Sequence, residues 1–169
     1  MGTRGAFGFY KNGVTKVTYN HFDSYPSGLG DEIVNNFCRA FSLQEMYDMF
    51  DRIEMVKGDD AITDEMKGDL SVYANPEMKW MIDSASFLED SLFCEYAYIV
   101  NLDSKMLEVY KGFIKTPPKS SRYYDPKKDY ANPKYPNDNP YYPVDMIAEF
   151  ALDGKLADWD AEKVGKIRL

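Results

Sequence analysis

Apolar and polar residues alternate along two runs near the beginning of the chain, and such alternation is typical of β-strands. The two runs read TRGAFGFY and VTKVTYNHF, and the dipeptide Asn12-Gly13 lies between them. Asn-Gly is the strongest short-range signal for a hairpin turn, because both residues tolerate positive φ angles. The sequence therefore predicts a β-hairpin over residues 3–22.

Two registers are open for this hairpin, and they differ in which side chains share a face. A two-residue turn places Arg4 opposite His21. A three-residue loop pairs Arg4 with Asn20 instead, and it gathers four side chains on one face: Phe7, Phe9, Val17 and Tyr19. We predict the three-residue loop, because register follows the face that must be buried. In both registers Arg4, Asn20 and His21 lie at the open end of the hairpin.

Helical spacing of apolar residues follows in residues 31–41, which predicts a first helix. The apolar stripe consists of Ile33, Val34, Phe37, Cys38 and Phe41. Ser42 stands three residues before Glu45, an arrangement typical of a capping box at a helix N-terminus. A second helix is therefore predicted over residues 42–56.

The middle and the end of the chain carry weaker helical patterns. Residues 57–75 are polar and acidic, and we expect short helical pieces and loop there. A further helix is predicted to begin at Pro76 and to extend to residue 92. One or two helices, interrupted near Asp153-Gly154, are predicted over residues 144–164.

A strand pattern returns at residues 95–114, where two β-rich runs flank the turn residues Asp103 and Ser104. This segment is predicted to form a second hairpin. Residues 116–143 then hold seven of the nine prolines and six of the fourteen tyrosines. Such a composition disfavours regular structure and predicts an extended arm.

Two hairpins around a helical middle indicate an α+β fold: an antiparallel sheet from the segments 3–22 and 95–114, with helices packed on it. The chain has 169 residues, of which 44% are hydrophobic, and this predicts a single globular domain over residues 1–169 with the arm at about 116–143.

Charge narrows the classes of partner. The net charge of −8 repels nucleic-acid phosphates and anionic lipids, so we expect neither generic nucleic-acid binding nor membrane association. No apolar run approaches the length of a membrane span and no signal-peptide pattern is present, which predicts a cytoplasmic protein. Cys38 and Cys94 lie far apart in apolar segments, as is typical of buried thiols in a reducing compartment.

The segment TYNHFDSYPSGLGDE, residues 18–32, holds the single histidine of the chain. His21 is a candidate acid-base group, because it titrates near neutrality, and Asp23 can orient its ring. Ser24 or Tyr25 is then a candidate nucleophile or proton donor. The alternative is that these polar side chains bond the backbone of their own turn.

The glycines of this segment precede a predicted helix N-terminus, where exposed amides can hold an anion. Gly28 and Gly30, with Arg4 and Asn20, are therefore candidate ligand-binding residues for an anionic small molecule such as a nucleotide. Against this, the acidic residues that follow occupy the same helix end. One histidine and two separated cysteines provide no zinc ligand set and no calcium loop is present, so no metal and no cofactor are predicted.

Two other features favour a protein partner. Residues 45–69 carry nine acids, which form either a solvated helix face or a surface for a basic partner: Glu45, Asp48, Asp51, Glu54, Asp59, Asp60, Asp64, Glu65 and Asp69. The arm carries a net charge of +2 while the rest of the chain carries −10. It can fold back on the acidic body, cover the His21 loop, or present tyrosines to a partner.

The stretches GTRGAFGF, YNHFDSYPSGLG and EYAYIVNLDSKMLEVYKG resemble a family of uncharacterised proteins found among bacteriophage and microbial genomes. The resemblance implies a phage or microbial context, and the family has no assigned activity that could be carried over to this chain. The opening strand is also distantly similar to that of the N-terminal nucleophile hydrolases, whose mature chains begin with Cys, Ser or Thr. Removal of Met1 here exposes Gly2, which has no nucleophile.

Two hypotheses follow. The first is a small cytosolic, phage-encoded protein that binds a host or viral macromolecule through its acidic helices or its Tyr/Pro-rich arm. The alternative is a hydrolase or a small-ligand binding protein with its site at the loop; whether the chain catalyses a reaction stays open. For the second hypothesis we predict that the Arg4 guanidinium donates a hydrogen bond to Asp23 or to a loop carbonyl. We also predict that a pocket opens beside His21 and that its wall contains Tyr19, Tyr25 or a tyrosine of the arm.

Overall fold

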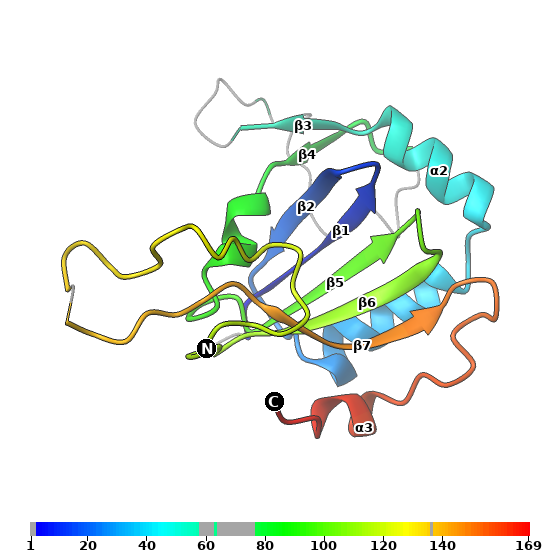
Figure 1. Cartoon of the computed structure of the whole chain (residues 1–169). Coiled ribbons are helices and arrows are strands. Elements are labelled where there is room, and N and C mark those ends of the chain that lie inside the picture. Colours follow the sequence, from blue (N-terminus) through cyan, green and yellow to red (C-terminus); the bar gives the residue numbers. More distant parts are fainter. Residues whose placement is uncertain (1–2, 58–62, 64–76, 136) are drawn as a thin grey trace.

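The computed structural model describes residues 3–57, 63, 77–135 and 137–169 (Figure 1). Its centre is a five-stranded sheet in the order β2-β1-β5-β6-β7. The strands are β1 Gly5–Lys11, β2 Val14–Asn20, β5 Tyr96–Asn101, β6 Met106–Lys111 and β7 Asp145–Ala151. The two predicted hairpins are confirmed, and β1 pairs in parallel with β5 to join them. The fold is α+β, with a mixed sheet.

The register of the first hairpin differs from our prediction. Gly5 pairs with Asn20 and Lys11 with Val14, so the turn has two residues and the predicted three-residue loop is wrong. Asn12 and Gly13 have φ angles of 50° and 80°, as a type I′ hairpin turn requires. Because a shift of one residue reverses the faces of a strand, Val17 lies in a different core from Phe7 and Phe9.

The helices follow the first hairpin. The first helical segment begins earlier than predicted, with the π-helical turn η1 Pro26–Gly30, and continues through α1 Asp31–Ile33 and the π-helical turn η2 Val34–Cys38. Helix α2, Leu43–Arg52, has the predicted capping box, because the Ser42 and Glu45 side chains each accept the other's backbone N–H. It ends four residues before our prediction, and its last predicted residues form β3, Glu54–Val56.

Two segments that were predicted to be helical contain a strand as well as a short helix. The segment 77–92 contains β4, Trp80–Ile82, which pairs in parallel with β3, and the 3-10 helix η5 Ala85–Glu89. The segment 144–164 begins with β7 and ends with the short helix α3, Ala161–Gly165. Of the segment 57–75, only residues 57 and 63 lie within the described residues.

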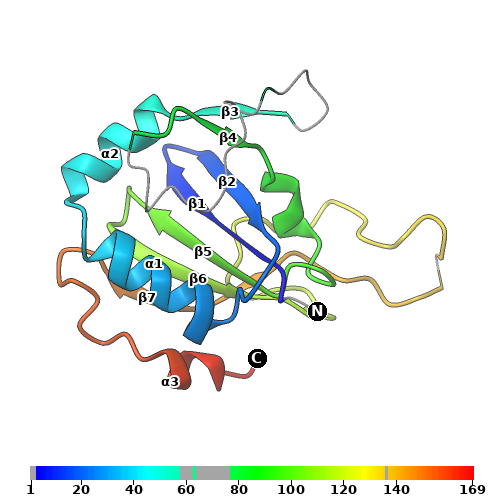
Figure 2. The same ribbon diagram turned by 180° about the vertical axis from the view of Figure 1, so that it is seen from behind.

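Both faces of the sheet are covered, but by different kinds of structure. The helices pack on one face, which is the nearer one in Figure 2, and bury the larger core around Phe7, Phe9 and Phe37. The other face buries a smaller core that includes Val17, Ile99 and Tyr110. Leu88 of η5 and Val144 before β7 complete this second core, and Tyr123 of the arm packs against it.

The predicted arm has no helix or strand in its described residues, 116–135 and 137–143. It leaves β6, crosses the second face of the sheet, projects beyond the body and returns to β7 (Figure 1). The arm thus begins and ends at the same end of the sheet. The bonds that hold its base are described below.

Candidate functional site

The predicted loop site has its polar groups bonded to one another. Tyr19 Oη and His21 Nδ1 lie 2.6 Å apart, and the His21 ring packs edge-on against Phe22 at a centroid distance of 4.4 Å. The imidazole is exposed. Tyr25 donates its hydroxyl to Asp23 Oδ1 at 3.2 Å, and this hydrogen bond raises the pKa of Tyr25. Asp23 therefore partners Tyr25, and His21 partners Tyr19.

Ser24 is completely buried, which makes it unavailable as a nucleophile toward a solvent-borne substrate. Its Oγ accepts a hydrogen bond from Asn20 Nδ2 at 2.8 Å, and its N–H donates to the Thr3 carbonyl at 3.0 Å. The Tyr98 hydroxyl donates to the Ser24 carbonyl at 2.7 Å from the centre of the sheet. Ser24 and Asn20 thus attach the loop to the strands.

The candidate anion-binding amides donate inside the loop. The N–H groups of Gly28 and Gly30 both donate to the Tyr25 carbonyl, at 2.9 and 3.4 Å, and the Leu29 N–H donates to the Asp23 carbonyl at 2.8 Å. A Cβ on Gly28 would collide with the same Asp23 carbonyl. These glycines therefore serve a tight chain reversal, and their amides do not point at a ligand.

Arg4 makes different contacts from those predicted. Its guanidinium lies over the Phe93 ring at 5.4 Å, and its backbone N–H donates to Glu95 Oε2. Among the described residues it makes no hydrogen bond to Asp23. A pocket of about 360 Å³ does open beside the loop with Tyr25 and Asn20 in its wall, but His21 does not line it. Four of the predicted residues, Asn20, Asp23, Tyr25 and Gly28, thus line this pocket, whereas Arg4, His21, Ser24 and Gly30 do not.

The acids of the second helix are also locally bonded. Glu45 caps the helix, Asp48 accepts a hydrogen bond from Gln44, and Asp51 pairs with Lys11 at 3.2 Å. The acids Asp59, Asp60, Asp64, Glu65 and Asp69 lie outside the described residues. Each of these three described carboxylates of α2 thus has a partner within the chain.

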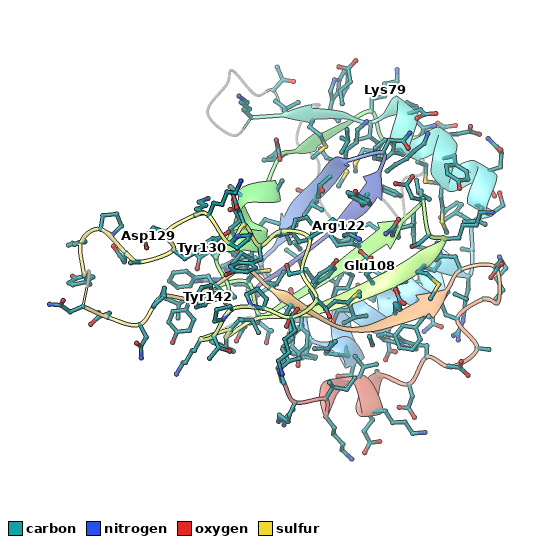
Figure 3. The ribbon with its side chains drawn as sticks, viewed as in Figure 1. Lys79, Glu108, Arg122, Asp129, Tyr130 and Tyr142 are labelled. Carbon is teal, nitrogen blue, oxygen red and sulfur yellow. The ribbon has the colours of Figure 1, made fainter. Side chains whose placement is uncertain are left out.

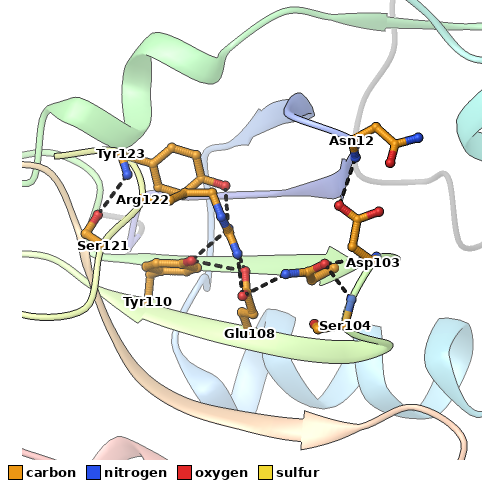
Figure 4. A network of polar contacts seen from close by, with 9 residues as sticks. Asn12, Asp103, Ser104, Glu108, Tyr110, Ser121, Arg122 and Tyr123 are labelled. Carbon is orange, nitrogen blue, oxygen red and sulfur yellow. Dashed lines mark hydrogen bonds and ion pairs between the residues drawn. The ribbon is translucent and has the colours of Figure 1, made fainter. Parts of the chain in front are cut away.

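An ion pair between the buried Glu108 and the partly exposed Arg122 holds the base of the arm, and sequence reasoning did not identify it (Figure 4). Arg122 of the arm makes a two-pronged contact with Glu108 of β6, and its Nη1 lies 2.7 Å from Oε1. The Arg122 guanidinium also stacks over the Tyr10 ring at 4.0 Å. Burial alone would lower the pKa of Arg122, but the hydrogen bond to Glu108 holds it above its ordinary value.

Glu108 has further partners on the same face of the sheet. Tyr110 donates its hydroxyl to Oε1 at 3.0 Å, and Asn101 Nδ2 donates to Oε2 at 3.1 Å. Burial and the Glu108 carboxylate raise the pKa of Tyr110, which stays neutral and donates. The carboxylate is therefore fully bonded, as a buried charge must be, and the cluster works as a structural anchor.

Four more contacts fasten the arm. The buried Asp145 carboxylate accepts the backbone N–H groups of Lys119 and Ser120 at 2.9 and 2.7 Å. The Tyr142 N–H donates to the Ile114 carbonyl at 2.8 Å. Across the gap between arm and body, Lys128 Nζ pairs with the Glu89 carboxylate of η5 at 2.7 Å.

Three tyrosines pack together where the arm leaves the body. The rings of Tyr124, Tyr130 and Tyr142 have centroid distances between 5.7 and 6.0 Å, and Figure 3 shows Tyr130 beside Tyr142 at this point. The cluster joins the outgoing and returning legs without any regular secondary structure. Beyond it, Tyr135 is 52% exposed.

The large exposed apolar side chains gather at the same end of the sheet as the arm. Asn20, Gly5, Tyr96, Lys111 and Asp145 form one row across the five strands and define this end. Phe22 and Tyr25 of the loop are exposed at this end as well. Four further exposed side chains lie on the arm and on the segments that enter β5 and leave β6, and these four form a surface apart from the loop: Leu92, Phe93, Phe113 and Tyr135. We call this surface the aromatic end. Exposed Val14 lies at the opposite end, across from Lys11.

No protein-family model matches the chain, and neither the curated proteins nor the solved structures contain a significant match. Within the described ranges, no helix has the length and apolar character needed to cross a membrane. The same ranges contain no group of three or more His, Cys, Asp or Glu side chains placed to hold a metal ion.

Proposed function

We propose that this chain is a protein-binding domain that contacts a protein partner through the arm and the aromatic end of the sheet. The observation that carries the proposal is the contrast within the arm: its base is bonded to the sheet through Arg122, Lys119 and Ser120, whereas Tyr135 beyond the base is exposed. A held base with an exposed aromatic side chain is suited to binding, because little conformational entropy is lost when a partner docks.

The composition of the aromatic end supports the same function. Tyrosine and phenylalanine are enriched at protein interfaces, and exposed apolar groups that gather in one region mark contact surfaces more often than scattered ones. Phe113 adds a further argument. It is exposed and has a φ angle of 58°, a left-handed conformation that costs a bulky residue roughly 1 kcal/mol or more. Such strain on an exposed aromatic residue favours a role in recognition.

A catalytic function for the loop has weaker support. Ser24 is buried, Asp23 bonds Tyr25, and the glycine amides bond loop carbonyls. Nucleophile, base and orienting group are therefore not arranged in one chain of hydrogen bonds, as covalent catalysis requires. The density of polar residues in this segment is explained by the bonds of its own turn.

Site-specific photo-cross-linking in a lysate of the source cells tests the proposal. A photoreactive phenylalanine analogue replaces Tyr135 in one variant and Val14, at the opposite end of the sheet, in a control variant. We expect a discrete protein to be cross-linked from position 135 and not from position 14.

An arm-trimmed variant makes the test specific. Residues 131–141 are replaced by a short Gly-Ser linker, which can close because the Tyr130 and Tyr142 rings are 5.7 Å apart. The excised segment contains one lysine and one aspartate, so the net charge does not change. Adding this variant in excess should leave the cross-link intact, whereas excess wild-type protein should suppress it. Equal cross-linking from positions 135 and 14, or none from position 135, would refute the proposed function.

A further inference from the structure

A cleft lies between the arm and the turn that precedes β5. Its volume is about 550 Å³, which is within the range of binding sites for small molecules and peptide side chains. The body contributes Asp90, Leu92 and Phe93 to its wall, and the arm contributes Tyr130 and Tyr135 among others. The Glu89–Lys128 ion pair bridges arm and body beside it. The cleft therefore has two walls that are tied together.

The two walls combine apolar and acidic groups. Leu92, Phe93 and Tyr135 are exposed in the absence of a partner. Asp90 and Asp138 contribute carboxylates from opposite walls, and neither carboxylate has a hydrogen bond or an ion pair within the part of the chain that the structure describes. The third acid, Glu89, is already paired with Lys128. Two acids without a cationic partner thus line the same cleft as Phe93, Tyr130 and Tyr135.

The aromatic rings of this region already associate with cations of the chain itself. Arg4 lies over Phe93 at 5.4 Å, Lys134 over Tyr135 at 5.6 Å, and Lys128 over Tyr130 at 5.5 Å. These contacts have the distances of cation–π pairs. A guanidinium stacks on an aromatic ring better than an ammonium group does, so an incoming arginine can replace Lys134 over Tyr135.

From these contacts we infer that the cleft binds an extended segment of the partner protein that carries arginine or lysine. The cationic groups lie between the carboxylates of Asp90 and Asp138, and the intervening residues pack on Phe93 and Tyr135. Prolines in the segment fit the tyrosine and proline side chains of the wall, because an extended polyproline-like strand stacks on flat aromatic surfaces. The overall charge of −8 favours the approach of a basic segment. This inference rests on the proposed function and names the chemistry of the partner.

Amide chemical shifts measured by NMR test the inference on the intact chain. The probe is a synthetic peptide that alternates arginine with proline, and the matched peptides carry glutamine or glutamate in place of arginine. We expect the arginine peptide to shift the amide signals of Asp90, Phe93 and Tyr135 at concentrations up to about 1 mM, and to do so less as salt is added. The glutamate peptide should leave them unchanged.

Two charge variants provide the control. Asp90→Asn with Asp138→Asn should weaken binding of the arginine peptide on the order of fivefold, since exposed ion pairs contribute modestly. Asp153→Asn with Asp158→Asn makes the same change in net charge at exposed positions beyond β7 and should not weaken it. No shift with the arginine peptide, equal shifts with the glutamate peptide, or equal weakening by the two variants would overturn the inference. If the cross-link at position 135 persists in those cases, only the inference about the cleft is wrong and the proposed protein-binding function still holds. If the cross-link is absent as well, both the inference and the proposed function are wrong.

Discussion

The loop at residues 20–30 and the arm at residues 116–143 both carry many polar and aromatic side chains, but they use them differently. In the loop, Asn20, Ser24 and the glycine amides bond other parts of the loop or the adjacent strands. In the arm, the bonds to the sheet are confined to the base, and Tyr135 beyond it is exposed.

The comparison shows that a high density of polar groups does not by itself form a binding site. A polar group that is already bonded costs free energy to redirect toward a ligand. The exposed Tyr135 ring of the arm has no such cost, and covering it with a partner lowers the free energy. We therefore assign binding to the arm and a structural role to the loop.

Alkaline pH should remove the anchors of both regions and have the largest effect. Burial raises the pKa of Tyr98, which holds the loop, and of Tyr110 and Tyr123 at the arm, and raises that of Cys38 to about 12. A group whose pKa is raised in the folded state contributes its full stability while the pH is below its unfolded-state pKa, which is about 8.5 for Cys and 10 for Tyr. This stability is lost as the pH rises from the unfolded-state pKa toward the folded-state pKa.

We expect the free energy of unfolding to fall by about 7 kcal/mol between pH 8 and pH 11, since each group contributes about 1.4 kcal/mol per pH unit above its unfolded-state pKa. Urea unfolding at several pH values measures the slope. The variant Cys38→Ala should show a slope that is shallower by one group. A free energy of unfolding that does not change up to pH 10.5 would show that these groups are not buried.

Loss of Arg122 should destabilise the arm base more than any change in the loop. The variant Arg122→Ala leaves the Glu108 carboxylate buried without its cation, which should cost about 3 kcal/mol in the free energy of unfolding. Chemical denaturation measures it. The double variant Arg122→Ala with Glu108→Gln should recover part of the loss, because no charge then remains to be compensated. A cost below about 0.5 kcal/mol for the single variant would contradict a buried anchor.

The Tyr98 hydroxyl should matter for the loop to a smaller degree. Tyr98→Phe leaves the Ser24 carbonyl without its donor in the interior, and we expect a loss of about 1–2 kcal/mol in the free energy of unfolding. Thermal unfolding measures this loss. Hydrogen exchange of the Ser24 amide should accelerate more than that of residues in β6. Unchanged stability would mean that the loop is not attached through this bond.

The smallest effect is expected at His21. Its ring is exposed and contacts only Tyr19 and Phe22 among the described residues, so His21→Ala should change the free energy of unfolding by less than about 0.5 kcal/mol. Denaturant titration measures this, and cross-linking from position 135 should be unaffected. A loss of the cross-link in this variant would return the loop to consideration as a binding site.

The elements with strong local signals were predictable from the sequence. The structure confirms the hairpin around Asn12-Gly13, the Ser42–Glu45 capping box and the lack of helix or strand in the described part of the arm, although the hairpin turn has two residues and not the predicted three. The hairpin register was not predictable from hydrophobicity, because the sheet is buried on both faces. Both registers place apolar side chains in a core, so the turn geometry decides.

The strand β7 was missed for a physical reason. A bulge places Val109 opposite Ala148 and Tyr110 opposite Met146, so Ile147 is an extra residue. Ile147 and Phe150 consequently pack on the same core although they are three residues apart. That spacing imitates a helix. Strand β4 escaped detection because its support comes from the distant strand β3.

The candidate site was predictable only in part. The aromatic content of the arm indicated a contact surface. Leu92 and Phe93 belong to the same surface because the sheet places the beginning of β5 beside the arm, and the sequence alone does not show this. The anchor residue Glu108 does have a signal: it is a charged residue on the same face of its strand as buried Tyr110. Its partner Arg122 could not be identified, because the arm has no periodicity.

The central claim is that the arm, and not the loop, binds the partner. The most direct test compares capture of the protein cross-linked at position 135 by three immobilised forms: wild type, the variant with residues 131–141 replaced, and a loop variant with His21→Ala and Tyr25→Phe. The arm-trimmed form should capture none of the cross-linked protein, whereas the loop variant should retain the wild-type amount. The unfolding curves of both variants should show that they are folded. Capture by the arm-trimmed form together with loss of capture by the loop variant would show that the loop, and not the arm, binds the partner.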